Sequence, residues 1–178
     1  RNFLTGVATD SHRLSSSSLE IKNVQNFNSL ILPRKTVFQL CSILAETNDS
    51  LVIQTSENKI KFCLGNIKLV SKVIDGKFPD YKKVVPMNND KALLVSSKDF
   101  INSIERVASV SLDRKEGVKL KINKDNIQLS VNSANSGEGN EIIKAEFNSD
   151  NLNISFNSKY LIDLISEIQD KRLKLNLK

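Results

Sequence analysis

The feature of this sequence that most constrains its fold is a pattern that occurs three times. Residues 32–44, 95–107 and 156–168 each contain an apolar residue that ends an extended run, two residues suited to capping a helix, a lysine, and an amphipathic helix. The lysines recur at intervals of about 60 residues: they are Lys35, Lys98 and Lys159. This period predicts repeated structural units, each made of a helix and the strands around it.

Within each copy, apolar residues follow the spacing of a helix that buries one face. The sequence predicts helices over 34–45, 98–108 and 158–168. The first is expected to bury Val37, Phe38, Leu40, Cys41 and Leu44. The second is expected to bury Phe100, Ile101, Ile104, Val107 and Ala108.

Between the helices, apolar and polar residues alternate in short runs separated by turn residues, which is typical of half-buried antiparallel strands. Extended runs occupy 4–8 and 13–19, and residues 132–140 are expected to form a loop. The segment 78–86 contains two prolines and is expected to be extended, as a crossing between domains. The sequence therefore predicts an α+β fold with domains at 1–82 and 83–178.

Composition excludes little beyond membrane proteins. No apolar run approaches the roughly 20 residues that span a bilayer, and no signal-peptide pattern opens the chain. The net charge of +6 is compatible with a polyanionic partner, but it is equally compatible with none. The chain does not begin with Met, and its third helix should be followed by further strands, so we expect a fragment of a polypeptide that continues past Lys178.

No group of residues predicts catalysis or metal binding. Cys41, Cys63 and His12 do not have the paired spacing of a zinc site, and two reduced thiols are the simpler interpretation. Asp10, Ser11 and His12 are adjacent, whereas the members of a catalytic triad come from separate elements. The segment 137–139 lacks the Lys-Ser/Thr of a phosphate-binding loop. A binding or structural protein without cofactors is favoured.

The exposed sides of the three helices offer a candidate surface for nucleic acid. Lysines on these sides, with neutral residues between them, would make weak, salt-sensitive and sequence-independent contacts with DNA. Glu105, Asp163 and Glu167 lie on or near the same surface. Ordinary solvated helix faces therefore remain an alternative.

Three motifs are more specific than the repeat. Residues 7–14 read Val-Ala-Thr-Asp-Ser-His-Arg-Leu, residues 32–35 read Leu-Pro-Arg-Lys before a helix, and residues 73–81 read Val-Ile-Asp-Gly-Lys-Phe-Pro-Asp-Tyr. In this order they resemble the ATDGHRL motif, the helix-opening motif and the VDGRFPDY crossing of the bacterial DNA polymerase III beta subunit, the replicative sliding clamp. The resemblance covers the whole chain, as most of the second clamp domain and the first part of the third.

That resemblance implies a DNA-clamp fold, with helices on one concave face and sheets outside. The family forms a homodimeric ring that encircles duplex DNA in the bacterial cytoplasm, associated with the nucleoid. It is a non-catalytic processivity factor of DNA replication, and it tethers the replicative polymerase, the clamp loader and other partners, which dock short peptides into a pocket. It implies no metal, cofactor or membrane contact.

Carried over by motif, the peptide pocket has an apolar floor and a polar rim, which suits a peptide with one or two hydrophobic anchors. It would use Thr9, Ser11, His12, Arg13, Leu14, Pro79, Lys83 and Val84. The alternative is that Asp10 to Leu14 form a simple turn between strands. Two residues depart from the family pattern, because Ser11 replaces a usual Gly and Lys83 replaces a common Arg.

Residues that face DNA are implied in the same way. The candidates are positions that match the family's motif or repeat, together with two lysines from the repeat itself: Arg34, Lys35, Lys98, Arg114, Lys115, Asn157, Lys159 and Tyr160. The competing hypothesis is a non-catalytic nucleic-acid-binding module that acts through a basic surface alone. Such a module should bind short linear duplexes at low salt, whereas a clamp fragment should bind them little.

Overall fold

The computed structural model describes residues 2–21, 28–111, 117–134, 136–168 and 170–178. By the density of its contacts the chain divides into two units, residues 1–85 and residues 86–178. The first unit contains β1 (Asn2–Thr9), β2 (Leu14–Ile21), α1 (Arg34–Leu44), β3 (Val52–Thr55), β4 (Lys59–Leu64), β5 (Ile67–Lys72) and the short 3-10 helix η1 (Tyr81–Lys83). The second contains β6 (Lys91–Ser96), α2 (Ser97–Ala108), β7 (Gly117–Ile122), β8 (Asn126–Ser133), β9 (Gly137–Phe147), β10 (Leu152–Asn157), α3 (Ser158–Ser166) and β11 (Arg172–Leu177).

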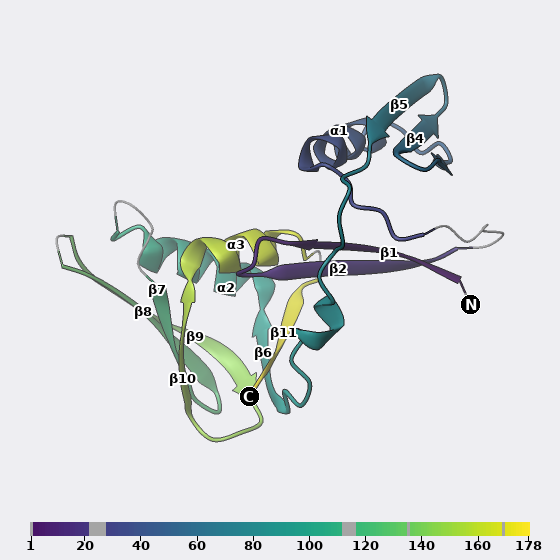
Figure 1. The fold of residues 1–178 in the computed structure, drawn as a ribbon. Coiled ribbons are helices and arrows are strands. Elements are labelled where there is room, and N and C mark those ends of the chain that lie inside the picture. The colour runs from purple at the N-terminus through teal and green to yellow at the C-terminus, as the bar shows by residue number, and fades with distance from the viewer. Residues whose placement is uncertain (1, 22–27, 112–116, 135, 169) are drawn as a thin grey trace. The chain divides into compact units, whose positions relative to one another are not determined.

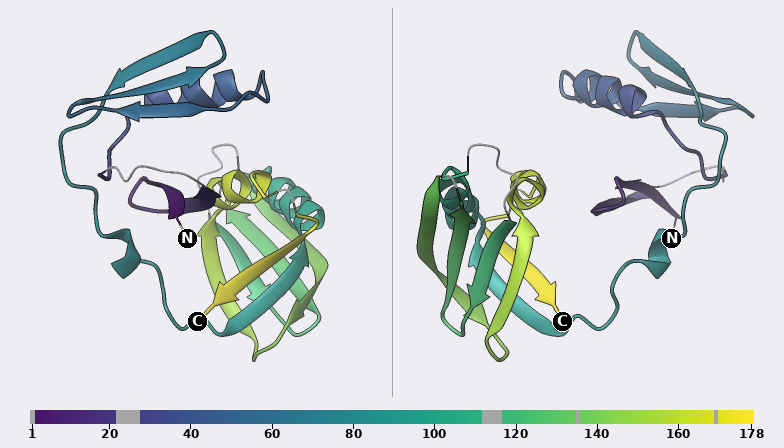
Figure 2. Two further views of the ribbon diagram at one scale, coloured as in Figure 1. Left: turned by 90° about the vertical axis from the view of Figure 1, so that its right-hand side faces the viewer. Right: turned by 60° about the vertical axis from the view of Figure 1, so that its left-hand side comes forward.

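The second unit is a curled antiparallel sheet with two helices on one face (Figure 1). Its strand order is β10-β7-β8-β9-β6-β11, and α2 and α3 pack against each other over the inner face (Figure 2). Inward positions of the central strands, such as Leu120, Ile122 and Leu129, are fully buried. The predicted apolar face of α2 is confirmed: Phe100, Ile104, Val107 and Ala108 are buried, and Ile101 packs against the core.

Both helices of this unit begin at capping residues that the repeat predicted. The Ser96 side chain accepts a hydrogen bond from the backbone N–H of Asp99 at the start of α2. The Asn157 side chain accepts one from the backbone N–H of Tyr160 at the start of α3. Each cap satisfies one N–H that the first helical turn leaves without a partner.

The predicted loop over 132–140 is wrong at both ends, because β8 extends to Ser133 and β9 begins at Gly137. Gly137 has a φ of +106°, which glycine adopts without a steric penalty. Gly139 runs close beneath α2, and a Cβ there would lie 2.9 Å from Val110 Cγ2 and 3.0 Å from the carbonyl oxygen of Val107. These glycines therefore serve the hairpin and its approach to α2, rather than a flexible loop.

An ion pair joins α2 to β9 beside this approach. Arg106 binds both carboxylate oxygens of Glu141, with 3.0 Å from Nε to Oε2, and Nη2 contacts Oε1. Ser103, which is fully buried, donates from Oγ to Oε1 at 3.0 Å. The hydrogen bonds from Arg106 lower the pKa of Glu141 below its usual 4.5, against the effect of partial burial, and the Ser103 hydroxyl adds to the lowering.

Replacing Glu141 by glutamine should lower the free energy of unfolding by about 1 kcal/mol at neutral pH, a value discounted for the exposure of Arg106. Because the folded-state pKa of Glu141 is depressed, its contribution is complete above pH 4.5 and is lost as the pH falls through the folded-state value. Denaturant unfolding of both proteins across this range should show the difference shrinking with acid. The matched control is Glu146→Gln. Glu146 lies on the same strand as Glu141, and it forms an exposed ion pair with Arg172 of β11. An equal loss in both variants would contradict the prediction.

The first unit contains a two-stranded hairpin, β1–β2, and a three-stranded antiparallel sheet in the order β3-β4-β5. The strands predicted over 4–8 and 13–19 are confirmed. Ile31 forms an isolated bridge to Ile74. Thr36 of α1 hydrogen-bonds to Ser71 of β5 at 2.7 Å between the hydroxyl oxygens, so α1 lies over one face of this sheet. Ile60, Phe62 and Leu64 are buried on that face.

The predicted buried face of α1 is wrong in this structure. The residues that turn toward the sheet are Thr36, which is buried, and Leu40 and Ile43, which are half-buried. Val37 and Phe38 are 41% and 61% exposed. The apolar face of α1 is wider than the surface that the sheet can cover, so the sheet buries only one edge of this face.

The sequence predicted that the segment 78–86 is extended, and this prediction is wrong for part of it. Tyr81–Lys83 form η1, in which the N–H of Val84 donates to the carbonyl of Tyr81 at 3.1 Å. The prolines restrict φ at their own positions, but they leave the residues between them free to turn.

Candidate functional site

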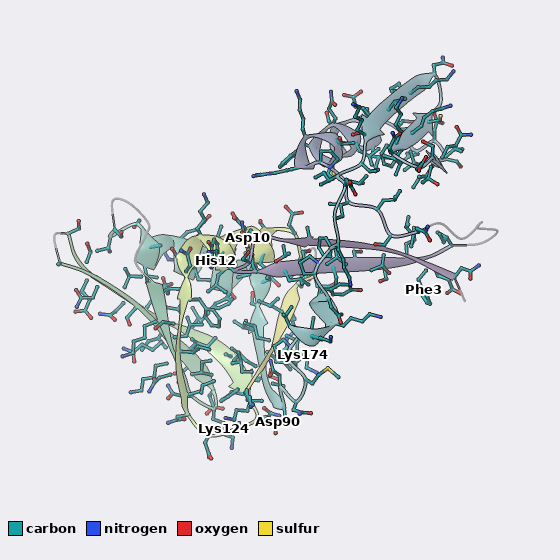
Figure 3. All side chains as sticks on the ribbon, in the orientation of Figure 1. Phe3, Asp10, His12, Asp90, Lys124 and Lys174 are labelled. Atoms are coloured by element: carbon teal, nitrogen blue, oxygen red, sulfur yellow. The ribbon has the colours of Figure 1, made fainter. Side chains whose placement is uncertain are left out.

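The predicted pocket motif lies at the end of the β1–β2 hairpin (Figure 3). Thr9 and Leu14 are directly opposite each other as the last pair of the ladder, and residues 10–13 form the loop between them. Thr9, Ser11 and His12 are exposed, and Arg13 and Leu14 are half-buried. The five predicted residues of this motif are therefore brought together by one short turn.

Asp10 organises this turn. Its Oδ1 accepts hydrogen bonds from the backbone N–H groups of His12, at 3.1 Å, and of Arg13, at 3.0 Å. Its Oδ2 accepts from Nε of Arg13 at 3.0 Å. Local bonding of this kind is how an aspartate stabilises a tight turn. The carboxylate thus fixes the backbone on which His12 and Arg13 are presented.

Thr9 closes the turn from the other side. Its hydroxyl donates to the carbonyl of Arg13 at 2.8 Å and accepts from the N–H of Ser11 at 3.2 Å. Together with the Asp10 bonds, this satisfies backbone groups on both sides of the loop. The side chain of Thr9 is therefore engaged within the loop, and its role there is to shape it.

The charge of Asp10 is stabilised by the same bonds. Desolvation acts to raise its pKa, but the backbone N–H groups of Arg13 and His12 and the Arg13 side chain outweigh it, so the pKa of Asp10 is lowered. The carboxylate is ionised at neutral pH and is already occupied by its neighbours. Asp10 therefore has a positioning role, which the sequence signalled only weakly, as an aspartate that precedes a turn.

Ser11 adopts a φ of +73°, in the left-handed region. For a residue other than glycine this conformation costs about 1–2 kcal/mol. The family pattern has glycine at this position, and the departure therefore introduces strain into the loop. The bonds made by Asp10 and Thr9 hold the strained backbone in place.

The other predicted pocket residues lie around η1. Pro79, Lys83 and Val84 are exposed, and Val84 is 70% exposed. Lys83 Nζ lies 3.3 Å from Asp80 Oδ2, but both side chains are more than half exposed, and such pairs contribute little to stability. An apolar side chain and a cation are thus available to a partner at this segment.

The candidate DNA-facing residues of the first unit open α1. Arg34 and Lys35 are both exposed. The guanidinium of Arg34 lies over the ring of Phe38, 5.1 Å from its centroid, in a cation–π contact. This contact holds the Arg34 side chain along the helix, while Lys35 extends into solvent.

The candidates of the second unit lie in its two-helix layer. Lys98 and Lys159 are exposed on α2 and α3, which pack side by side. Asn157 uses its side-chain oxygen as the cap of α3, and Tyr160 is half-buried one turn later. Arg114 and Lys115 lie outside the described residues. The layer also carries Asp99, Glu105, Asp163 and Glu167, so it is of mixed charge.

In the described part of the chain, no cluster of three or more His, Cys, Asp or Glu side chains could hold a metal ion. Cys41 and Cys63 are both free thiols. Among the described helices, none has the length and apolarity needed to cross a bilayer.

Comparison with known proteins agrees with the motifs. The model of the DNA polymerase III beta subunit, central domain, matches residues 1–80, and that of the C-terminal domain of the same subunit matches residues 82–178. The chain is 32% identical over 166 residues to a beta sliding clamp of Caulobacter vibrioides, and 30% identical over 174 residues to that of Escherichia coli K12. These matches cover 93% and 98% of the chain, but only 45% and 48% of the relatives.

Solved structures show the same fold. A sliding clamp of Bartonella birtlesii, bound to griselimycin, superposes with a TM-score of 0.93 at 38% identity, over 99% of this chain and 48% of that one. A DNA polymerase III subunit beta of Pseudomonas aeruginosa has a TM-score of 0.93 at 30% identity, with the same shares covered. The predicted clamp fold is therefore confirmed, and the chain spans about half the length of the relatives it matches. It belongs to the DNA polymerase III beta subunit family, the sliding clamps, which are non-catalytic processivity factors of DNA replication.

Proposed function

We propose that this chain is part of a ring-shaped clamp that encircles duplex DNA and tethers the replicative polymerase, the clamp loader and other partners. The observation that carries the proposal is the β1–β2 loop, in which hydrogen bonds from Asp10 and Thr9 hold the backbone around an exposed His12, next to a half-buried Leu14. A loop that is preorganised by its own hydrogen bonds, with one apolar side chain and polar neighbours, suits the capture of a short peptide, because preorganisation lowers the entropy lost on binding.

The peptide pocket combines this loop with the segment around η1. Leu14, Pro79 and Val84 provide its apolar floor, and His12, Arg13 and Lys83 provide its rim. Thr9 and Ser11 shape the loop between them. An anchor residue of the partner would bury apolar surface against the floor, while the rim would bind the polar and acidic groups that flank it.

The DNA-facing surface is proposed to bind the phosphate backbone through basic residues. Arg34, Lys35, Lys98 and Lys159 would contact phosphates, and Arg114, Lys115, Asn157 and Tyr160 complete the proposed set. Phosphate contacts carry no sequence information, and the acids in the same layer keep the attraction weak. Weak and uniform contacts are what a ring needs in order to slide.

The whole protein is proposed to be a homodimer in the bacterial cytoplasm, associated with the nucleoid. Within it, residues 1–82 would belong to the second clamp domain and residues 83–178 to the third. A closed ring holds DNA by topology, whereas a surface module holds it by charge alone.

This difference gives the test. The full-length protein, assembled by its clamp loader on a nicked circular DNA, should remain bound through a wash at about 1 M salt, because screening at this ionic strength removes charge contacts and leaves encirclement intact. Gel filtration of labelled protein with the DNA measures retention. The same complex cut once with a restriction enzyme is the control, and it should lose the protein. Equal loss from circular and linear DNA would contradict a ring.

A further inference from the structure

The sheet β3-β4-β5 has a second face, which α1 does not cover. Side chains alternate between the faces of a strand, and the ladder places Ile53, Phe62 and Leu69 in one row on the α1 side. The opposite, outward face carries two valines, a glutamine, a cysteine and four lysines: Val52, Gln54, Lys59, Lys61, Cys63, Lys68, Val70 and Lys72. This set is called the outward face below.

The outward face is positively charged without compensation. The three strands contain no aspartate or glutamate, and within the described chain none of the four lysines makes an ion pair. Lys59 is directly opposite Lys72 in the ladder. Like charges at directly opposed positions destabilise a sheet. The fold thus retains an unfavourable pair that an acidic partner would make favourable.

The same face exposes apolar surface between the lysines. Val52 is 52% exposed and Val70 is 57% exposed. Val70 is opposite Lys61, and Val52 is opposite Cys63, which is itself next to Lys68 in the ladder. The outward face is therefore amphipathic, with apolar side chains that phosphate groups could not use.

The spacing of the lysines identifies the shape of the partner. Lys59 and Lys61 are two residues apart on one strand, and alternate side chains of a strand are separated by about 6.6–6.8 Å. An extended peptide presents its own alternate side chains at the same interval. Acidic residues at alternate positions could therefore face successive lysines, with an apolar residue over Val70.

Nucleic acid fits this face less well. Single strands are bound by stacking on aromatic side chains, and the described outward face has none. A duplex is contacted through phosphates, which would leave Val52 and Val70 exposed. We propose that the outward face docks an extended acidic segment of a partner protein that carries an apolar residue among its acids.

This surface is independent of the peptide pocket and of the DNA-facing residues proposed above, since none of its side chains takes part in either. It would give the chain a second protein contact, selected by charge. The contact would be sensitive to salt and would form rapidly, because complementary charge accelerates association.

The test uses a fluorescent synthetic peptide with glutamate at alternate positions and one central leucine on the same side, titrated into the 178-residue chain. Fluorescence anisotropy should show saturable binding at low salt. Replacing Lys59, Lys61, Lys68 and Lys72 by glutamine should weaken it by about tenfold or more, as four partly exposed ion pairs would. Removing the opposed lysines should also raise the unfolding temperature, as measured by circular dichroism. A raised unfolding temperature would show that the variant binds less tightly although it is still folded.

The matched control removes the same charge elsewhere, by changing Lys119, Lys124, Lys144 and Lys174 to glutamine; all four are exposed. This variant should retain the affinity for the peptide. A peptide with glutamine in place of glutamate should not bind. The proposal is overturned if both variants lose affinity equally, if the acidic peptide does not bind, or if a short duplex binds the outward face more tightly than the peptide does.

Discussion

Replacing Leu14 by aspartate should abolish the binding of partner peptides to the full-length protein. Leu14 is half-buried at the end of the hairpin, and it is the one apolar residue among the predicted pocket members Thr9, Ser11, His12, Arg13 and Leu14. A central apolar contact of this kind contributes about 2 kcal/mol or more, which is at least thirtyfold in affinity. The aspartate would also place an unpaired charge against the peptide's anchor residue, so the loss should exceed that value. Isothermal titration calorimetry with a clamp-loader or polymerase peptide measures it.

The control for this experiment lies on the same strand. Leu19 is 63% exposed, five positions further along β2, and is paired with Leu4. Leu19→Asp introduces the same charge into the same hairpin, away from the loop, and it should leave the affinity within about twofold, as surface changes usually do. Unchanged binding by Leu14→Asp would remove the loop from the pocket. Equal losses in both variants would point instead to the stability of the hairpin.

Truncating Phe100 to alanine should have the largest effect on stability. Its side chain is fully buried between α2 and the sheet of the second unit. Removing a buried phenylalanine side chain costs about 3–5 kcal/mol, since transfer free energy is lost and a cavity remains. The chain has no tryptophan whose fluorescence could report unfolding, so native-state hydrogen exchange of the β7 and β8 amides is the suitable measurement. These amides report on the second unit alone.

Leu164→Ala is the matched control for Phe100. Leu164 lies on α3 of the same unit but is 48% exposed, so its truncation should change stability by no more than about 0.5–1 kcal/mol. A loss of protection at Phe100→Ala no larger than that of the control would mean that the core of this unit does not depend on α2.

Sequence patterns predicted the second unit better than the first. For α2, the period of Phe100, Ile104 and Val107 and the cap at Ser96 all agreed with the structure. For α1, the same kind of pattern gave the wrong buried side. Apolar periodicity shows that a helix has an apolar face, but how much of that face is buried depends on the element that packs against it. That neighbour is distant in sequence and leaves no local signal.

For the candidate site, the motif located Thr9 to Leu14 but not how they are held. Asp10 accepts hydrogen bonds from His12 and Arg13, and the Thr9 hydroxyl donates to the carbonyl of Arg13. These roles follow from the geometry of the turn, which composition does not specify. The sequence showed that Ser11 replaces a usual Gly, and the structure adds that this position has a φ of +73°.

By itself, then, the sequence determined the family, the repeated units, the capping residues and the alternation of the strands. These depend on residues within a few positions of one another, where spacing alone dictates the geometry. The opposition of Lys59 and Lys72 is also local, because β4 and β5 form a hairpin whose register is fixed by its short turn. Only the tertiary structure decided which side of α1 is covered. That side depends on the sheet that packs against the helix, and the strands of this sheet come from another part of the chain.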